Sequence, residues 1–425
     1  MNRSTKHGVL GLAALGAAGL FVSAAAHAAG KLDVLYSFCA QAGCPDGDQP
    51  YGGVTLDGAH HLIGTTGFGG AYNGGTVFAL RQKRHGAKLR TLKSFCTGTP
   101  PDCQSDEGPS TTLVEDVGGN IYGTAYFAGS SNDGAAFELE AKGNGRYKLR
   151  YLHTFDGSDG AGPNELSYAG QASGARYDGT SPLYGSTVAG GANGSGTVYT
   201  LTPGKSGWNF QTIYTFCSAA NCTDGGLPRA SVIVDPSGAL FGTTDYDGAD
   251  NAGTIYRLAM TNGAWDFSLL YTFCSAAGCS DGNAPFARLA EDGSGNLYGT
   301  TYFGGNANDG VVFELAANGK YSVLHSFCSE QGCADGSEPF AAVTLDAAGD
   351  LFGTTSRGGD RNYGDVFEVT SAGKFKRVYS FCALNSCADG GYPYGTLALD
   401  SAGHIFGTTQ YGGAWDLGEV YRLTR

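Results

Sequence analysis

The chain has 425 residues, and its 26 basic and 39 acidic side chains give a net charge of −13. A chain this acidic is not expected to bind nucleic acid or anionic membranes, because such binding relies on Lys and Arg side chains that neutralise phosphate. Its length exceeds the ~250–300 residues at which a single hydrophobic core stops growing, yet no linker divides it. One domain built from stacked units would satisfy both observations.

Residues 1–28 have the pattern of a secretory signal peptide. Arg3 and Lys6 form a basic start, residues 9–26 are apolar, and residues 26–28 have the small-x-small form of a cleavage site. We favour cleavage over a membrane anchor, because the many Ala and Gly residues partition weakly into lipid. The mature chain would carry 24 − 39 = −15 charges. No later stretch approaches the ~20 apolar residues of a membrane helix, so we expect a secreted or periplasmic protein with no membrane insertion after cleavage.

The remainder of the chain repeats one phrase seven times. Each copy contains a run of the Leu-Tyr-Ser-Phe type, most copies a Cys-x4-Cys-x-Asp-Gly-x-x-Pro loop, and then runs of the types Leu-Tyr-Gly-Thr-Thr and Gly-Thr-Val-Phe-x-Leu. Spacings of 57, 60, 61, 57, 54 and 54 residues separate the anchoring phenylalanines, which are Phe38, Phe95, Phe155, Phe216, Phe273, Phe327 and Phe381. A fixed period of this size indicates a repeat architecture.

One copy illustrates the predicted elements. Runs of β-branched and aromatic residues bounded by Gly, Asp and Pro are typical of strands, and they predict strands over 321–327, 340–346, 351–355 and 365–369. A cysteine loop, a tight turn and a Gly-Gly loop join these strands in order. No stretch of the mature chain shows helical periodicity.

Seven copies of four short antiparallel strands predict an all-β, seven-bladed β-propeller over residues 29–425. The mature chain opens with an outer-strand run, 32–38, and ends with a third-strand run, 418–423. We therefore expect the N-terminal strand to pair with the last blade and close the ring, which leaves no free sheet edge. The loops after the second and fourth strands should then share one face of the molecule.

A glycine lies inside the second strand of every copy. Glycine weakens a strand unless backbones approach closely, so we interpret it as a sign that blades wedge together near the axis. The positions are Gly64, Gly123, Gly185, Gly242, Gly299, Gly353 and Gly407.

The twelve cysteines fall into six local pairs, and the third copy has none. Their loss as a pair is typical of disulfides, and an exported chain meets an oxidising environment. Zinc is the weaker interpretation, because each pair supplies only two of the four ligands of a structural site. The pairs are Cys39/Cys44, Cys96/Cys103, Cys217/Cys222, Cys274/Cys279, Cys328/Cys333 and Cys382/Cys387.

Together these runs resemble the GloVer tandem repeat, of the family described as choice-of-anchor tandem-repeat proteins. The resemblance rests on the Gly-Gly-x4-Gly-Thr-Val-Phe, Leu-Tyr-Ser-Phe, Asp-Gly-x-x-Pro and Asn-Leu-Tyr-Gly-Thr-Thr runs, and it covers nearly all of residues 31–425. It implies an exported bacterial surface or secreted protein and brings no catalytic residues. Such proteins often carry a C-terminal anchoring tail, whereas this chain ends inside a strand run, which favours a freely secreted or periplasmic protein.

An aspartate recurs in the Asp-Gly-x-x-Pro loops. A ring of carboxylates could gather cations or sugar hydroxyls, but an Asp before Gly and Pro more often bonds its own backbone. We favour the structural role for these residues, which are Asp46, Asp159, Asp224, Asp281, Asp335 and Asp389.

A specific ligand site should lie where the copies differ. Variable aromatic and arginine side chains follow the repeated proline or lie in the Gly-Gly loops, and aromatic faces beside acids suit carbohydrate. Packing between blades is the alternative role for these rings. The candidate ligand-binding residues are Tyr51, Arg229, Phe286, Phe340 and Tyr394, together with Arg357, Arg361 and Trp415.

The acidic loop with Asp245, Asp247 and Asp250 is the one candidate metal site. Calcium prefers several oxygens on a short loop, but a solvated turn is the stronger interpretation. We expect no cofactor. The usual catalytic motifs are absent from the sequence, so no catalytic residue is assigned, and the histidines are interpreted as surface and packing residues.

Three functions stay open from the sequence. The first is an exported binding or scaffold module, monomeric, for a glycan or a surface protein at the channel mouth. The second is an extracellular polysaccharide hydrolase or lyase that uses channel carboxylates, and the third is a purely structural surface protein. We favour a protein without enzymatic activity.

Overall fold

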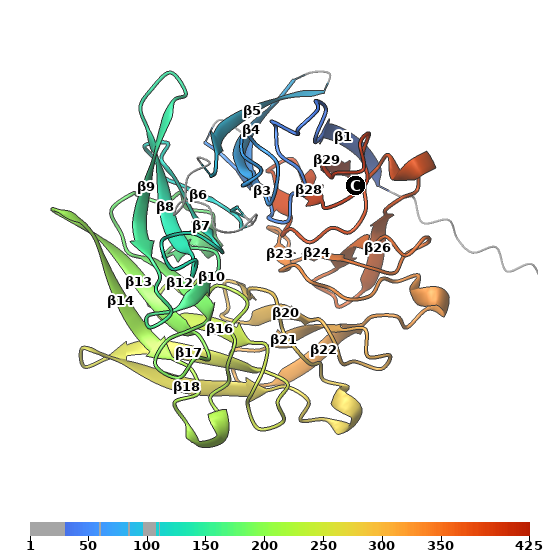
Figure 1. The fold of residues 1–425 in the computed structure, drawn as a ribbon. Coiled ribbons are helices and arrows are strands. Elements are labelled where there is room, and N and C mark those ends of the chain that lie inside the picture. The colour runs from blue at the N-terminus through green and yellow to red at the C-terminus, as the bar shows by residue number, and fades with distance from the viewer. Residues whose placement is uncertain (1–29, 59–60, 84–85, 97–107, 110) are drawn as a thin grey trace, which may run out of the picture.

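The computed structural model describes residues 30–58, 61–83, 86–96, 108–109 and 111–425. Seven sheets stand like blades around a central axis, and the chain runs around the ring in order (Figure 1). The predicted signal segment lies outside the described residues. Within the described ranges, no helix is long and apolar enough to cross a membrane.

Every blade contains four antiparallel strand positions, from an inner to an outer strand. The inner strands are β2 (Thr55–Leu56), β6 (Val114–Glu115), β11 (Ser167–Tyr168, with β10 Ala161–Pro163 beside it), β15 (Ile233–Val234), β19 (Ala290–Glu291), β23 (Thr344–Leu345) and β27 (Ala398–Leu399). The second strands are β3 (Leu62–Thr66), β7 (Ile121–Ala125), β12 (Leu183–Ala189), β16 (Leu240–Thr244), β20 (Leu297–Thr301), β24 (Leu351–Thr355) and β28 (Ile405–Thr409).

The third strands are β4 (Thr76–Gln82), β8 (Ala135–Ala141), β13 (Thr197–Gly204), β17 (Thr254–Thr261), β21 (Val311–Leu315), β25 (Asp365–Val369) and β29 (Glu419–Thr424). The outer strands are β5 (Ala87–Ser94), β9 (Tyr147–Thr154), β14 (Gly207–Thr215), β18 (Ala264–Thr272), β22 (Tyr321–Ser326), β26 (Phe375–Ser380) and β1 (Lys31–Ser37). Short 3-10 turns are η1 (Gln171–Ser173), η2 (Ala220–Cys222), η3 (Ala277–Cys279), η4 (Gln331–Cys333) and η5 (Asn385–Cys387). We number the blades 1 to 7 by their inner strands, from β2 to β27.

The first strand closes the ring, as predicted. β1 pairs antiparallel with β29, and Lys31 lies opposite Thr424. Blade 7 is also joined to blade 1, because the Thr408 hydroxyl donates to the Gly52 carbonyl at 2.9 Å. Seven complete blades therefore leave no unpaired strand at the seam.

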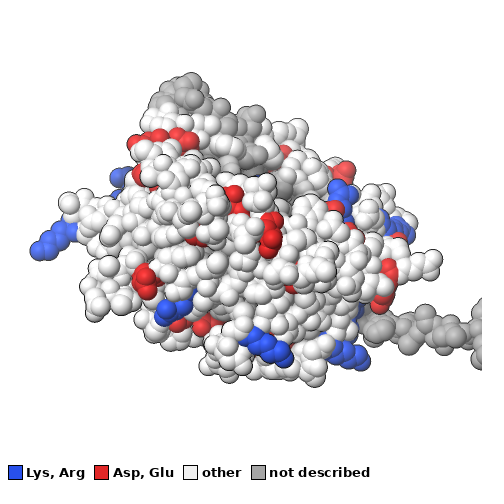
Figure 2. Space-filling model, turned by 90° about the horizontal axis from the view of Figure 1, so that it is seen from below, with Lys and Arg blue, Asp and Glu red and all other residues white. Residues whose placement is uncertain are grey.

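The surface carries no large patch of one charge on the side drawn in Figure 2. Acidic and basic side chains are scattered singly among neutral residues in this edge-on view.

Neighbouring blades pack through one repeated aromatic pair. The phenylalanine at the end of each outer strand contacts the aromatic residue in the third strand of the next blade, with ring centroids 5.0–5.3 Å apart. Such pairs contribute about 0.5–1.5 kcal/mol beyond the area that they bury. The pairs are Phe38–Phe78, Phe95–Phe137, Phe155–Tyr199, Phe216–Tyr256, Phe273–Phe313, Phe327–Phe367 and Phe381–Tyr421.

The glycine of each second strand serves the same pair, which corrects our interpretation of it. Gly64 lies opposite Phe78 in the sheet, and a Cβ on Gly64 would stand 2.7 Å from the tip of that ring. The same clash would occur at the six equivalent glycines. A ring, and not a neighbouring backbone, therefore occupies the space that a side chain would need.

The two threonines after this glycine tie the blades together. The first donates to a backbone carbonyl of the next blade, as Thr65 does to Thr111 at 3.1 Å and Thr300 to Ala341 at 3.2 Å. The second bonds the third strand of its own blade, as in the 2.9 Å contact between the Thr66 and Thr76 hydroxyls. The Gly-Thr-Thr run is thus a structural signature of the ring.

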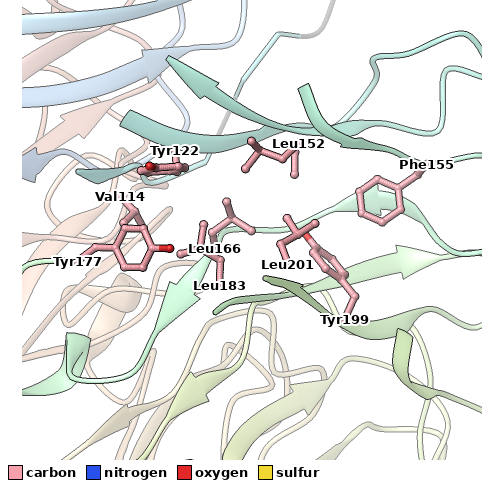
Figure 3. Close-up of a cluster of buried hydrophobic side chains, with 10 residues drawn as sticks. Val114, Tyr122, Leu152, Phe155, Leu166, Tyr177, Leu183, Tyr199 and Leu201 are labelled. Atoms are coloured by element: carbon pink, nitrogen blue, oxygen red, sulfur yellow. The ribbon is translucent and has the colours of Figure 1, made fainter. Parts of the chain in front are cut away.

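Apolar side chains form seven clusters, one between each pair of neighbouring blades. Figure 3 shows the cluster between blades 2 and 3, where Tyr122 and Leu152 face Leu183 and Tyr199. Each unit buries its faces only against its two neighbours, which is how a chain of this length avoids needing one central core.

Two features differ from the predicted elements. The inner strand predicted over 340–346 is reduced to β23, because the residues before it form the wall of the channel instead of a ladder. Blade 3 carries a longer connection, 169–182, with η1 in it, and Tyr177 of this loop is fully buried against blade 2. This loop was not predicted from the sequence.

Candidate functional site

The loops after the second and fourth strands meet on one face, as expected. Backbone bridges join them within a blade, for example Ser337 to Arg357 in blade 6 and Gly391 to Tyr411 in blade 7. On this face a cavity of about 460 Å³ opens at the axis, and residues from all seven blades line it. We call this cavity the channel mouth.

One side of the channel mouth is a continuous arc of rings. The centroids of neighbouring rings lie 5.7 Å apart for Tyr51 of blade 1 and Tyr394 of blade 7, and 5.2 Å apart for Tyr394 and Phe340 of blade 6. The centroids of Phe340 and Phe286 of blade 5 lie 5.6 Å apart. The Arg229 guanidinium lies 5.2 Å from the Phe286 ring centre and extends the arc into blade 4. We call these five residues the aromatic arc.

Residues of the Gly-Gly loops support the aromatic arc from outside. Tyr302 stacks on Phe286 at 4.9 Å, and its hydroxyl donates to Glu338 at 2.7 Å. Arg229 forms an ion pair with Asp245. Burial raises the pKa of Asp245, while Arg229 beside it favours the charged carboxylate. These contacts hold the rings and the arginine in place, so the arc does not depend on loose surface side chains.

The opposite side of the channel mouth combines polar groups with Tyr126 and Val188. Asn164 of blade 3 is buried, and its amide donates to the Ser186 hydroxyl at 2.9 Å and to the Pro228 carbonyl at 2.7 Å. The neighbouring Glu165 accepts a weak hydrogen bond of 3.4 Å from the Thr112 amide. Glu165 is the one carboxylate among the described residues that line the cavity. An elongated ligand here would meet the aromatic arc on one side, and on the other side the polar groups of Asn164 and Glu165 beside Tyr126.

Five of the eight predicted ligand-binding residues line the channel mouth, and they are the five of the aromatic arc. Arg357 lies outside it and pairs with Glu338 at 3.1 Å. Arg361 and Trp415 are exposed on the Gly-Gly loops of blades 6 and 7 and do not line the cavity. Three lining residues with amide or charged side chains were not predicted from the sequence, and they are Asn164, Glu165 and Arg288. Their signal was an unusual residue type one to three positions after the repeated proline, which aligning the seven copies would have revealed.

The repeated aspartates bond their own blades. In four blades a tyrosine hydroxyl of the outer strand donates to the aspartate at 2.7 Å, in the pairs Tyr36–Asp46, Tyr214–Asp224, Tyr271–Asp281 and Tyr379–Asp389. The Asp389 carboxylate also accepts the Ala383 and Leu384 amides at 2.8 and 2.9 Å. These contacts are those that a structural role requires.

Two histidines occupy the place of that tyrosine. His153 bonds Asp159 at 2.6 Å and His325 bonds Asp335 at 3.0 Å. Burial lowers the pKa of His325, although the Asp335 carboxylate opposes this effect. His325 therefore serves the cysteine loop and lies away from the channel mouth.

The candidate calcium loop does not gather its three carboxylates. Asp245 is buried against Arg229, while Asp250 is exposed. Where the structure describes the chain, the one group of three potential ligand atoms close enough to share an ion is Asp309, Cys328 and Cys333, and both cysteines are disulfide-bonded.

Five of the six predicted disulfides are present, at Cys39–Cys44, Cys217–Cys222, Cys274–Cys279, Cys328–Cys333 and Cys382–Cys387. Cys103 of the sixth pair lies outside the described residues. Disulfides persist in oxidising compartments, so this set is consistent with an extracytoplasmic protein.

Comparison with known families gives the identity of the repeat. The model of the Gloeobacter/Verrucomicrobia repeat matches residues 167–334 and 280–425. The chain belongs to this family. No curated protein sequence matches it.

Solved structures resemble the chain in fold alone. A mutant puromycin hydrolase complexed with PGG has a TM-score of 0.50 and 13% identity, and the match covers 85% of this chain and 50% of the hydrolase. The chain thus spans about half the length of that enzyme. A putative 6-phosphogluconolactonase from Bacteroides uniformis has a TM-score of 0.47 and 17% identity, over 83% of this chain and 92% of that protein.

Proposed function

We propose that this protein is an exported binding module that holds a glycan at the channel mouth. The observation that carries the proposal is the aromatic arc, in which four rings and one arginine from five blades form a single surface. Phe340 at its centre is 37% exposed. An exposed ring of this kind offers an apolar face to a ligand, while Asn164 and Glu165 line the same cavity with polar groups.

Sugars match such a two-sided site. One face of a pyranose ring presents C–H groups that pack against an aromatic face, while its hydroxyls exchange hydrogen bonds with amides and carboxylates. Asn164 and Glu165 face the arc across the cavity. A cavity of about 460 Å³ falls within the ~300–1,000 Å³ range of small-molecule sites, which suits a terminal segment of a saccharide.

Binding is favoured over hydrolysis. Most glycosidases use two carboxyl groups on either side of the scissile bond, about 5–10 Å apart. Of the described lining residues only Glu165 supplies a carboxylate, and the nearby Asp245 and Glu338 are engaged by Arg229 and Arg357. We place the protein in the periplasm or the extracellular medium, in keeping with the signal-like segment and the disulfides.

The test is to remove the central rings of the arc. Phe340→Ala and Tyr394→Ala should each weaken binding to the best oligosaccharide of a glycan array by about 10-fold or more, as expected for well-placed aromatic anchors. Affinity is measured by titration calorimetry, and folding by the melting curve.

Two further variants sharpen this test. Trp415→Ala removes a ring that is 56% exposed on the same face but outside the cavity, and it should bind like the parent. Phe340→Leu keeps apolar packing without an aromatic face, and it should bind as poorly as Phe340→Ala. Parental affinity in folded Phe340→Ala and Tyr394→Ala proteins would rule out this site.

A further inference from the structure

Arg288 stands inside the channel, below the aromatic arc. It lines the channel mouth and also a second cavity of about 160 Å³ on the side of the inner strands β15, β19 and β23. Phe286 of the arc precedes it by two residues in the same segment of blade 5. Arg288 is therefore the residue that a ligand would meet next on passing the arc into the channel.

The Arg288 position is unique among the blades. The residue three places after the repeated proline is small, hydroxylic or apolar elsewhere, at Gly53, Thr112, Leu166, Ser231, Ala342 and Thr396. The neighbouring lining residues Ala287, Ala341 and Ala342 are small. Space is thus available beside the one long cationic side chain of this ring of positions.

The charge of Arg288 is not neutralised by a described residue. Its Nε is buried and has no hydrogen-bond partner, and no described carboxylate lies within ion-pair distance. Arg229 at the rim differs, since it is paired with Asp245. Tyr168 of blade 3 lies near enough to Arg288 for the arginine charge to oppose the rise that burial causes in the pKa of Tyr168.

We infer that Arg288 binds the carboxylate of an acidic sugar, so that the glycan held by the aromatic arc is a uronate-containing saccharide. This inference rests on the proposed function. The planar guanidinium group matches the geometry of a carboxylate. A buried donor that has no hydrogen-bond partner costs free energy, and a bound carboxylate would remove that cost. Carboxylate fits better than phosphate here. One guanidinium balances one negative charge, whereas a dianion would meet the Glu165 and Glu291 carboxylates that line the two cavities.

The experiment compares oligosaccharides that differ only in charge. Oligogalacturonate, oligomannuronate and hyaluronate fragments are titrated against their carboxyl-reduced forms, with the intact mature protein. The parent should prefer at least one acidic member by about 10-fold or more, and this preference should shrink at high salt. Arg288→Gln should abolish the preference while binding of the neutral form changes less than about twofold.

Matched variants control for charge and folding. Arg361→Gln removes an exposed arginine of the same face that does not line the cavity, and it should keep the preference. Arg288→Lys keeps the positive charge without the planar guanidinium, and this variant should retain only part of the preference for the acidic saccharide. Melting curves confirm folding.

The outcomes separate this inference from the proposed function. Equal binding of acidic and reduced saccharides, or an unchanged preference in Arg288→Gln, overturns the acidic ligand and leaves a glycan site at the arc. A stronger response to sulfated or phosphorylated fragments than to uronates overturns the choice of carboxylate. No binding of either member of any pair overturns the acidic ligand, whereas the proposed function is overturned only if no glycan of the array binds at the arc.

Discussion

Two buried carboxyls replace a threonine at one repeated position. The third strand begins with threonine in blades 1, 3 and 4, but with Asp365 in blade 6 and Glu419 in blade 7. Both side chains are fully buried, and none of their carboxyl oxygens has a hydrogen-bond partner among the described residues. Burial raises the pKa of Asp365 to about 7. Burial also raises the pKa of Glu419 well above its ordinary value.

Asp365 should make stability fall as pH rises. Its folded pKa of about 7 lies above the ordinary 3.8, so the folded state holds a proton that the unfolded state releases. The stability is therefore full below pH ~4, declines between pH ~4 and ~7, and is constant above. Asp365 lies opposite Thr355 in the ladder of blade 6, and Asp365→Thr places there the threonine that begins the third strand of blade 1. Above pH 7 the free energy of unfolding of this variant should exceed that of the parent by roughly 2–4 kcal/mol.

Urea unfolding at several pH values from 4 to 9 measures this effect. Asp250→Thr removes an exposed carboxylate and serves as the control for net charge. Identical pH profiles for Asp365→Thr and the parent would show that Asp365 is not the titrating group.

Two kinds of contact stabilise each cysteine loop, a disulfide and the hydrogen bonds of an aspartate. The disulfide of blade 7 joins Cys382 to Cys387, and Asp389 bonds the same loop through Tyr379 and two backbone amides. Blade 3 has no cysteines and still holds its loop through the contact of His153 with Asp159. The aspartate carboxylate is thus the stabilising group that loops with and without cysteines share.

Removing one disulfide should therefore leave a folded protein. The double change Cys382→Ser and Cys387→Ser should cost roughly 2 kcal/mol, because the ring that it opens is short. Asp389→Ala should cost at least as much, since it strands the Tyr379 hydroxyl and two amides. Both are measured as free energies of unfolding from urea titrations. A disulfide variant that fails to fold, beside a stable Asp389→Ala protein, would reverse this ranking.

The sequence predicted those elements whose residues act within one repeat. The predicted strands 351–355 and 365–369 match β24 and β25 residue for residue, because their alternation and flanking glycines are local signals. The inner strand was predicted too long, because its first residues are apolar and line the channel instead of pairing in the sheet. The 169–182 loop of blade 3 was missed because its packing against blade 2 is a contact between repeats.

The candidate site was predicted by contrast between copies. Large rings after the proline stood out, so the aromatic arc was found. Asn164, Glu165 and Arg288 were missed, because a single polar residue in one copy resembles ordinary surface variation until the ring places it on the axis. The candidates Arg361 and Trp415 lie on the Gly-Gly loops outside the cavity, because the sequence does not tell which loop residues turn outward.

At the scale of the whole molecule, the ring depends on one seam. β1 is held by its ladder to β29 and by the ion pair of Asp33 with Arg422 at 2.8 Å, and Phe38 after it packs on Phe78 of blade 1. Deleting residues 31–39, with Cys44→Ser to avoid a free thiol, should expose β29 as an edge and separate blades 7 and 1. We expect aggregation and loss of a cooperative melting transition, observed by light scattering and circular dichroism.

A circular permutant is the matched control. Lys31 lies opposite Thr424, so a short turn can join residue 425 to residue 30, with new ends opened in the turn between β21 and β22. This chain keeps every strand pair and should melt like the parent. A deletion protein that stays monomeric with the parental melting curve would show that the seam is dispensable.

The seam also sets an order of events in time. Six blades take all their strands from one continuous stretch of chain, so each can form by pairing strands that lie close together in the sequence. The seventh depends on two distant segments, because its outer strand β1 precedes all the other strands and its partner β29 follows them; Asp33 and Arg422 are 389 residues apart. Bringing such distant segments together is slow relative to local pairing. Until β1 and β29 pair, the folding molecule is therefore an open crescent with two unmatched ends, and a chaperone that guards it has one strand to shield.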